Sequence, residues 1–544
     1  MLTIANVGQF SCPFMDDNGN FQTHFSIIKA IGDLSHITCP ARCAARIGQA
    51  FSDTPFTVPI TENEIFVSEM PDVKSADGSR VFSDGVGSIS YSAVECIWES
   101  IPDRYSYPTC FQIRFGGSKG MLALDTKLRG SLIQLRPSMT KFESEDIHNL
   151  EICDMGTKPI PLVLNRQIIK ILEDMGVSEQ WFFKLQTAEL EHLRGITASA
   201  FSIARFMKHH NIGDAVGLHR MYRQSRNMDL DYKKDPFLRS IVEAVILREL
   251  RLLKHKARIP VKKGITLFGV MDETGFLEEH EVYVTYDTIN GRHLPPPARG
   301  PIIVTRSPAL HDGDIQCAYN SIPPKNHPLH NHRNCIVFSQ KGKRDLPSQL
   351  SGGDLDGDLY NIIWDPEATP KQLFEPADYP RVEPVNIGRT VTAEDMAEFF
   401  VDFMKTDHLG VIATRHMILA DQEELGTRHP DCKRLAELHS TAVDFSKTGI
   451  PVMMEDLPRA NSFRPDLYVH PIITQNIKLT DSVWHQDHKH TSAINPKLYS
   501  TNTFTSLRTM KTRIPNHVAG TTNRIKSSES FTEQSMKQRS GTKL

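Results

Sequence analysis

The chain has no strong excess of charge of either sign. Its 544 residues carry 62 Lys and Arg against 65 Asp and Glu, which gives a formal net charge of −3 at pH 7. A wholly basic nucleic-acid-binding protein is therefore excluded, and any surface for a polyanion must be a local basic channel. The hydrophobic content of 39% is ordinary for a globular chain. The length exceeds what one core usually supports, so we expect several domains.

The sequence also lacks the marks of secreted and membrane proteins. Its nine cysteines are scattered from Cys12 to Cys432 without a Cys-x-x-Cys pair, which argues against a disulfide framework. The first residues contain no charged region followed by a long apolar run, and no apolar stretch approaches membrane-spanning length. We therefore expect reduced thiols and an intracellular protein of the cytoplasm or nucleus, with no membrane partner.

One acidic loop carries the most informative chemistry of the chain. The segment Ser351-Gly-Gly-Asp-Leu-Asp-Gly-Asp-Leu-Tyr360 places Asp354, Asp356 and Asp358 close together, with glycines before and between them. The β-branched and aromatic residues on both sides predict strands, so the loop is a tight connection that enters a strand. Because residues two apart on an extended segment share a side, all three carboxylates can point at the same ion.

Three interpretations of this loop compete. A solvated acidic turn is the common fate of Asp and Gly in sequence. A calcium loop of the helix-loop-helix type also begins Asp-x-Asp-x-Asp, but it needs Gly at its sixth position and usually Glu at its twelfth, where this chain has Leu359 and Asp365. Magnesium fits better because it uses few protein carboxylates and completes its shell with water and phosphates. Such a site indicates phosphoryl chemistry, and nucleotidyl transfer needs this acidic triad with nearby cations.

Candidate cations stand beside glycine or proline turns in three other segments. These are Arg114-Phe-Gly-Gly-Ser-Lys-Gly120, Gln134-Leu-Arg-Pro-Ser-Met-Thr-Lys-Phe142 and Gln340-Lys-Gly-Lys-Arg-Asp345. Lysine is a compact charge suited to a triphosphate, and the planar guanidinium of arginine binds phosphate oxygens in pairs. For each basic residue taken singly, a solvated surface charge is the alternative.

A histidine-rich segment offers a second candidate for metal binding. The pattern His327-x-x-His330-x-His332-x-x-Cys335 has zinc-ligand types at short spacing. Pro328 and the strand predicted to begin at Cys335 favour an exposed polar loop instead.

The acidic loop also matches a family signature. The chain resembles the catalytic region of the cellular RNA-dependent RNA polymerases of eukaryotic RNA silencing, whose signature Asp-x-Asp-Gly-Asp is here Asp354-Leu-Asp-Gly-Asp358. Further similar blocks follow in family order over most of the chain. They are Arg46–Ser52, Ser83–Ser90, Arg114–Gly120, Leu135–Phe142, Gly269–Gly275, Thr305–Pro308, His311–Ile315, Asp407–Gly410 and Ala442–Gly449.

This resemblance implies an α+β fold with two double-psi β-barrels in one chain, joined and flanked by helical segments. The second barrel would carry Asp354, Asp356 and Asp358 as catalytic ligands of Mg²⁺, or of Mn²⁺ in its place. The first barrel would present Lys119 and Lys141 to the incoming triphosphate. Four further candidates for contact with nucleotide or RNA lie in or beside the matching segments: Arg136, Arg306, Lys341 and Arg344.

Composition and periodicity, together with what the resemblance implies, divide the chain into six parts. They are an amino-terminal segment of the catalytic region (1–75), the first double-psi barrel (76–154), a helical connector (155–258), the second barrel with the catalytic loop (259–375), a helical neck (376–490) and a tail of disordered composition (491–544). The last helix of the connector ends in several cations, which complement the helix dipole or alternatively face RNA phosphates.

The resemblance predicts an RNA-directed RNA polymerase that copies a single-stranded RNA template from ribonucleoside triphosphates and serves the small-RNA silencing machinery. Relatives usually have a longer amino-terminal region and continue for hundreds of residues, so the chain resembles a catalytic core without parts of both ends. A catalytically inactive RNA-binding or scaffold paralogue is the alternative. The shortened ends favour that alternative, whereas the intact acidic triad argues against it, because clustered carboxylates are costly without a cation.

Overall fold

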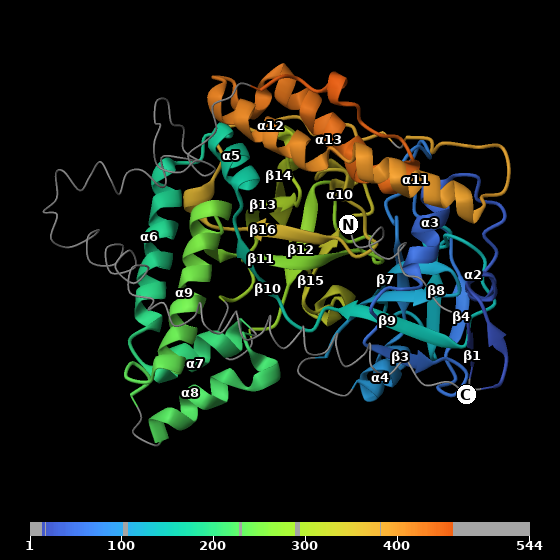
Figure 1. The fold of residues 1–544 in the computed structure, drawn as a ribbon, viewed down its shortest axis with the longest axis horizontal. Helices are drawn as coiled ribbons and strands as arrows, with labels where there is room; N and C mark the ends of the chain where they lie inside the picture. The colour runs from blue at the N-terminus through green and yellow to red at the C-terminus, as the bar shows by residue number, and fades with distance from the viewer. Residues whose placement is uncertain are drawn as a thin grey trace, which may run out of the picture. The chain divides into compact units, whose positions relative to one another are not determined.

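The computed structural model describes residues 13–460, apart from residues 17, 102–106, 211, 228–230, 289–293 and 381. Two seven-stranded sheets and several groups of helices build the predicted α+β fold (Figure 1). The predicted tail, residues 491–544, and the last part of the predicted neck lie outside the described residues. No helix in the described part of the chain is long and apolar enough to span a membrane.

The first sheet combines parallel and antiparallel strands. In spatial order its strands are β3 (Phe56–Pro59), β9 (Asn149–Met155), β6 (Cys110–Phe115), β7 (Ser118–Leu124), β5 (Val86–Ile89), β8 (Leu132–Leu135) and β4 (Phe66–Glu69). The pairs β4–β8 and β5–β7 are parallel, and the other pairs are antiparallel. Strands β3 and β4 precede residue 76, where we expected the first barrel to begin. Their partners lie far along the chain, so local patterning did not reveal the pairing.

The second sheet closes on itself. Its order is β10 (Ile160–Val163), β11 (Pro260–Met271), β15 (Cys335–Phe338), β12 (Glu281–Thr285), β14 (Ile315–Asn320), β13 (Gly300–Arg306) and β16 (Leu359–Ile363). Because β11 also pairs with β16, the strands from β11 to β16 form a closed barrel. Two of its pairs, β11–β15 and β12–β14, are parallel. The first sheet also has two parallel pairs. Strand β10 lies within the segment predicted as a helical connector, and it adds one strand to the sheet by pairing with β11.

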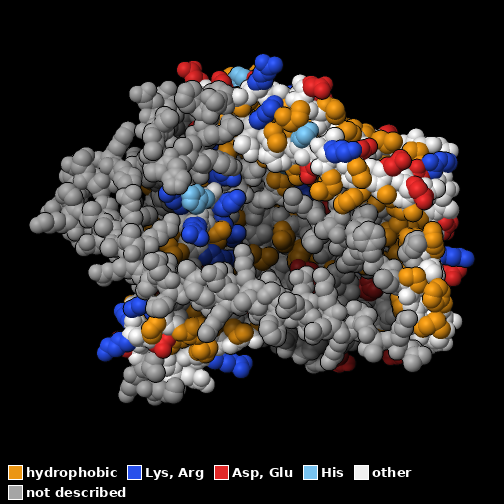
Figure 2. Space-filling view, in the orientation of Figure 1, with side chains coloured by type: hydrophobic (Ala, Val, Ile, Leu, Met, Phe, Trp, Pro, Cys, Tyr) orange, Lys and Arg blue, Asp and Glu red, His pale blue; other side chains and the backbone are white. Residues whose placement is uncertain are grey.

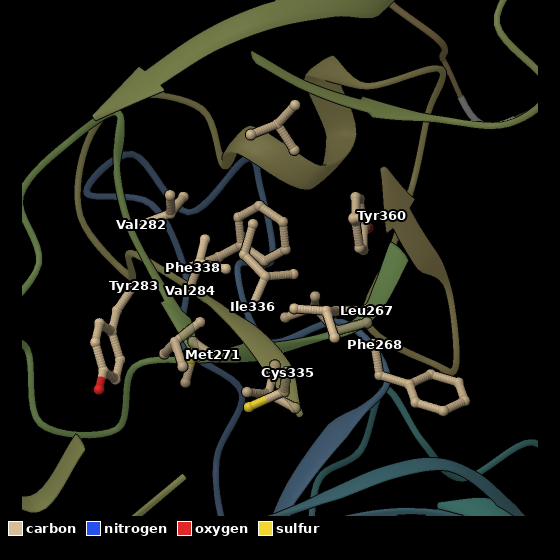
Figure 3. Packing of buried hydrophobic residues seen from close by; sticks show 14 of the residues in the cluster. Leu267, Phe268, Met271, Val282, Tyr283, Val284, Cys335, Ile336, Phe338 and Tyr360 are labelled. Atoms are coloured by element: carbon tan, nitrogen blue, oxygen red, sulfur yellow. The ribbon is translucent and has the colours of Figure 1, made fainter. Parts of the chain in front are cut away.

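The closed barrel is filled by apolar side chains that point inward from its strands (Figure 3). Phe338 and Tyr360 meet edge to face with ring centroids 4.7 Å apart. The same core continues into the first sheet, where Val86, Cys110 and Met121 are fully buried against it. A shared core holds the two sheets together, because separating them would expose this apolar surface to water.

Helices flank the sheets. Those before and within the first sheet are α2 (His24–Ile31), α3 (Pro40–Gln49) and α4 (Tyr91–Ser100). The predicted connector forms α5 (Arg166–Asp174), α6 (Glu179–Ile196), α7 (Ala200–His209), α8 (Leu218–Asn227) and α9 (Pro236–Lys256). Short α10 (Leu346–Gln349) precedes the acidic loop, and α11 (Ala393–Thr406), α12 (Leu409–Gln422) and α13 (Pro430–Thr448) form the neck, in orange in Figure 1.

Local sequence explains where these helices start. Helix α9 begins with Pro236 directly after Asp235, whose carboxylate accepts the Leu238 N–H at 2.8 Å. Helix α11 begins after Thr392, which forms a capping box with Asp395. In both cases a side chain satisfies an N–H group that the first helical turn leaves without a partner.

Truncating the shared core tests its contribution to stability. We expect Ile336→Ala to lower the free energy of unfolding by about 2–5 kcal/mol, because the change removes buried methyl groups and leaves a cavity. Ile160→Ala is the matched control, since Ile160 on edge strand β10 is 41% exposed. Urea unfolding followed by circular dichroism should separate the two variants, and equal losses would contradict this account of the core.

Candidate active site

The acidic loop lies between α10 and β16, in a backbone conformation that its glycines permit. Gly352 and Gly357 have φ values of 62° and 126°, in the region that residues with a Cβ rarely adopt. The hydroxyl of Tyr360 donates to the carbonyl oxygen of Asp354 at 2.7 Å, and the N–H of Gly269 on β11 donates to the carbonyl of Asp358 at 3.2 Å. These bonds attach both ends of the triad to the closed barrel.

The first sheet holds the same loop from the other side. The N–H of Leu355 donates to the carbonyl of Asp84 at 2.9 Å, and the side-chain amide of Gln112 donates to the carbonyl of Asp356 at 3.3 Å. Gly85 lies so close that a Cβ there would stand 2.4 Å from the Cβ of Asp356. The triad therefore lies at the junction of the two sheets, and a glycine makes that approach sterically possible.

The three carboxylates converge as the spacing predicted. One oxygen from each of Asp354, Asp356 and Asp358 lies within 4.8 Å of the others, and all three residues are partly exposed. The N–H of Asp354 donates to Oδ2 of Asp358 at 3.0 Å, and the N–H of Asp356 donates to Oδ1 of Asp354 at 3.2 Å. Loop backbone thus orients the side chains, while solvent still reaches them.

Two cations neutralise part of this negative charge. Lys119 forms an ion pair with Asp356, and both side chains are largely buried. Arg306, at the end of β13, binds Asp358 with Nε 2.6 Å from Oδ2 and Nη2 3.0 Å from Oδ1. Burial opposes the charge on Arg306, but Asp358 outweighs it, so the pKa of Arg306 rises. The predicted residues Lys119 and Arg306 are therefore brought to the triad from different sheets.

The carboxylates respond differently to these surroundings. Burial raises the pKa of Asp354 well above its usual range, and the negative charges of Asp356 and Asp358 act in the same direction. Burial also opposes ionisation of Asp356, but the charges of Lys119 and Lys141 outweigh it and lower the pKa of Asp356. The surroundings therefore shift the pKa values of these two carboxylates in opposite directions.

Lys119 and Lys141 are positioned by one pair of turns. The hairpin between β6 and β7 passes through Gly116 and Gly117, whose φ values are 52° and 80°. The N–H of Lys119 donates to the carbonyl of Met139 at 3.0 Å, and the N–H of Lys141 donates to that of Gly117 at 3.1 Å. Burial lowers the pKa of Lys141, and the charge of Lys119 adds to this effect. These backbone bonds hold both ammonium-bearing residues beside the loop.

The donor set fits a hard divalent cation. It consists of three carboxylates that share one small volume, and burial together with the charges of its two neighbours raises the pKa of Asp354. Oxygen donors of this kind suit Mg²⁺, Ca²⁺ and Mn²⁺ rather than zinc, which prefers imidazole and thiolate. A divalent cation bound here would favour the ionised form of Asp354 and reduce the repulsion among the three carboxylates.

Arg136 does not join this site. Its side chain is fully buried and forms two parallel bonds to Glu273, Nη1 to Oε1 and Nη2 to Oε2, each 3.0 Å long. Nη1 also donates to the carbonyl of Val86 at 2.6 Å, and Nε donates to that of Pro71 at 3.2 Å. With these acceptors in place, Arg136 has no accessible group for a nucleotide, contrary to our expectation. It instead connects the first sheet to the turn after β11.

Lys341 and Arg344 are also engaged elsewhere. Lys341 is 41% exposed and pairs with Glu278 at 2.6 Å. Arg344 donates from Nε to the Ser348 hydroxyl at 3.1 Å and from Nη2 to the carbonyl oxygens of Ser348 and Ala377, at 2.7 and 2.8 Å. Both residues were suggested by their proximity in sequence to the acidic loop. In the structure they contact Glu278, Ser348 and Ala377 and not the three aspartates. A nucleotide-binding role for them stays a prediction.

Three charged residues that we did not assign act on the triad. Asp84 raises the pKa of Asp354, and Lys447 on α13 helps to lower that of Asp356. Arg46 on α3 interacts electrostatically with Asp356 as well. All three lie in blocks that carried the family resemblance, and this was the only signal in the sequence that pointed to them.

The histidine-rich segment is not a metal cluster. His327 accepts the N–H of Leu329 at 3.3 Å, and His330 lies 3.2 Å from the Tyr283 hydroxyl. His332 is buried, and burial lowers its pKa to about 4. We expected an exposed loop, so the expectation is wrong for this residue. Among the described residues, the acidic triad is the one group whose ligand atoms lie close enough to share a metal.

Comparisons with known proteins agree with one another. A family model described as "RNA dependent RNA polymerase" matches residues 5–506. "Probable RNA-dependent RNA polymerase 2" of Oryza sativa subsp. japonica is 35% identical over 458 residues, which cover 80% of this chain and 38% of that protein. "RNA-dependent RNA polymerase 1" of Arabidopsis thaliana is 36% identical over 436 residues, covering 78% of this chain and 38% of that protein.

The fold is likewise similar to a solved structure. The "RNA dependent RNA polymerase QDE-1 from Thielavia terrestris" superposes with a TM-score of 0.68 at 19% identity, over 87% of this chain and 58% of that one. This likeness supports the predicted arrangement of two β-barrels. The chain spans 38% of the length of each of the two relatives named above.

The glycine at the junction of the sheets gives a test of the site. We expect Gly85→Ala to weaken Mn²⁺ binding about 10- to 100-fold, because the new methyl group would displace Asp356. Gly78→Ala is the control, since Gly78 has a similar φ of 72°, against 83° for Gly85, and a Cβ there would meet no atom within 4 Å. Electron paramagnetic resonance measures the bound Mn²⁺. Equal losses in both variants would show that backbone strain, not the clash, is responsible.

Proposed function

This chain belongs to the RNA-dependent RNA polymerase family, and we propose that it synthesises complementary RNA on a single-stranded RNA template from ribonucleoside triphosphates. The observation that carries this proposal is the convergence of three carboxylates at the closed barrel with lysines from the first sheet. Negative charge gathers the divalent cation, and positive charge beside it suits a triphosphate.

We propose Mg²⁺ as the ion held by Asp354, Asp356 and Asp358, with Mn²⁺ as a substitute. When bound, such an ion lowers the pKa of an attacking hydroxyl and compensates charge on the phosphates. The fit rests on the all-carboxylate donor set and on the partial exposure of the loop.

The transfer step follows from the groups around the loop. The 3′-oxygen of the growing RNA forms a bond to the α-phosphorus of the nucleotide, and the bond from that phosphorus to the bridging oxygen breaks. Pyrophosphate leaves with the electron pair, and the hydroxyl proton passes to water. Lys119 and Lys141 compensate the charge that develops on the leaving group, and Arg306 orients Asp358 by binding both of its carboxylate oxygens. No side chain acts as a covalent nucleophile.

The proposed RNA partner also has a candidate surface on α9. Arg248, Arg251, Lys254, Lys256 and Arg258 are all exposed or partly exposed at its carboxyl end. Figure 2 shows Lys and Arg side chains gathered over this part of α9. A few cations suffice to complement the helix dipole, and the remainder form a local basic surface of the kind that a chain with little net charge needs for a polyanion. From the family resemblance we further propose that the RNA product enters small-RNA silencing.

Nucleotide incorporation tests the central proposal. We expect Asp356→Ala to reduce incorporation by roughly 100-fold or more, because the change removes a metal ligand and the partner of Lys119. We expect the variant to remain folded, because backbone bonds to Tyr360 and Gly269 also hold the loop. Circular dichroism checks this, since the change leaves Lys119 without its partner. The control is Asp402→Ala, whose side chain is 73% exposed on α11. The assay supplies single-stranded RNA, four ribonucleotides and Mg²⁺, and detects labelled product.

The same assay distinguishes the non-catalytic alternative. If the unaltered chain binds RNA in a salt-sensitive way but makes no product, it is an RNA-binding or scaffold protein. Incorporation by Asp356→Ala at the rate of the unaltered chain would instead refute the assignment of the acidic loop.

The salt dependence of RNA binding tests the α9 surface. We expect the double variant Arg251→Gln, Lys254→Gln to reduce the slope of log affinity against log salt by about 1.4, because each phosphate contact on a single strand contributes about 0.7. Lys405→Gln, Arg434→Gln is the control pair, with side chains 69% and 55% exposed on other helices. Fluorescence anisotropy with labelled RNA gives the slopes. An unchanged slope would assign the α9 cations to the helix dipole alone.

A further inference from the structure

Arg46, on the last turn of α3, has hydrogen-bonding capacity that its surroundings do not use. Its Nε is buried and has no acceptor among the described residues. Its Nη1 lies 3.4 Å from Oε1 of Gln49, which is long for a hydrogen bond to a charged group. Leaving a buried donor without an acceptor costs free energy, and for a charged group the cost is larger. Unused donors of this kind are typical of a side chain that binds a ligand.

Helix α3 is held firmly in this position. The thiol of Cys39, at its start, lies 3.6 Å from the carbonyl oxygen of Thr448 and 3.8 Å from that of Lys447, at the end of α13. The N–H of Ile387 donates to the carbonyl of Thr38 at 3.1 Å. Arg46 therefore projects from a helix that is tied to the neck rather than from a mobile loop.

Positive charge accumulates on this side of the acidic loop. Lys119, Lys141, Arg46 and Lys447 all interact electrostatically with Asp356, although they come from the first sheet, α3 and α13. Lys119 is the cation that pairs directly with the carboxylate, and Lys141 donates to the carbonyl of Ser138. Burial lowers the pKa of Arg46 to about 10, with Arg42 acting in the same direction, so Arg46 remains charged at neutral pH. Asp84 also acts on Lys141, so two carboxylates, Asp356 and Asp84, interact with these four cations.

We propose that Arg46 is a phosphate-binding residue of this site, which receives the terminal phosphates of the incoming nucleoside triphosphate through its unused N–H groups. The inference rests on the proposed function. A guanidinium offers several donors in a fixed fork, which matches phosphate oxygens. A triphosphate concentrates several charges in a small volume, as this compact group of cations requires, whereas an RNA backbone spreads one charge over each nucleotide.

Direct binding of a nucleotide tests the proposal without requiring turnover. The probe is α,β-methylene ATP, measured by calorimetry with Mg²⁺ against the whole chain. We expect Arg46→Gln to weaken its binding about 10- to 100-fold, the loss typical of one or two hydrogen bonds to a charged group. Arg46→Lys should recover part of the affinity, because it restores the charge but not the fork. Arg434→Gln, an exposed arginine on α13, should bind as the unaltered chain does.

Two further measurements separate the possible outcomes. Binding of single-stranded RNA by the same variants shows whether Arg46 serves the nucleotide or the RNA backbone. A loss of RNA affinity with unchanged nucleotide affinity overturns the proposal, as does unchanged nucleotide affinity in Arg46→Gln. If the unaltered chain incorporates no nucleotide but Arg46→Gln still weakens nucleotide binding, the polymerase proposal fails and this one stands. If the unaltered chain binds no nucleotide, both fail. Thermal melting confirms that each variant is folded.

Discussion

The ion pair between Asp356 and Lys119 is the interaction on which the rest of the site depends, because it joins the acidic loop of the closed barrel to the first sheet. The backbone of each partner is held by a hydrogen bond. The side-chain amide of Gln112 donates to the carbonyl of Asp356, and the N–H of Lys119 donates to the carbonyl of Met139. A largely buried charge is tolerated only with a partner, so neither side chain can move away without a large cost. The shared apolar core beneath them keeps the two sheets at the distance that the pair requires.

The three carboxylates around this pair have different charged neighbours. Burial and the neighbouring acids raise the pKa of Asp354, whereas Asp358 is bound directly by Arg306. Negative charge is thus left uncompensated at one end of the triad, where a divalent cation would be stabilised. Lys119, Lys141 and Lys447 act on Asp356, and these cations would stabilise phosphates bound beside it. One loop can therefore present both kinds of site, because the neutralising groups come from different elements.

A second buried ion pair has a structural task. Arg136 and Glu273 form two parallel hydrogen bonds with each other, and both side chains are largely shielded from solvent. Arg136 directly precedes the turn that carries Lys141, and Glu273 follows β11 of the closed barrel. The pair therefore fixes the lysine-bearing turn relative to the barrel that carries the acids. This explains why a basic residue next to the site contributes to its geometry without reaching a ligand.

The sequence by itself determined the elements whose causes are local: the glycine-rich acidic loop, the strand that follows it, and the capped helices of the connector and neck. Spacing also determined that Asp354, Asp356 and Asp358 converge, since residues two apart on an extended chain share a side. Only the tertiary structure decided which cations reach them. Lys119 does and Arg136 does not, although both stand beside similar turns, and Arg46 arrives from a helix far away in sequence, near the start of the chain. Strand pairing and helix docking bring such groups together, and these depend on contacts between distant segments that no local pattern encodes.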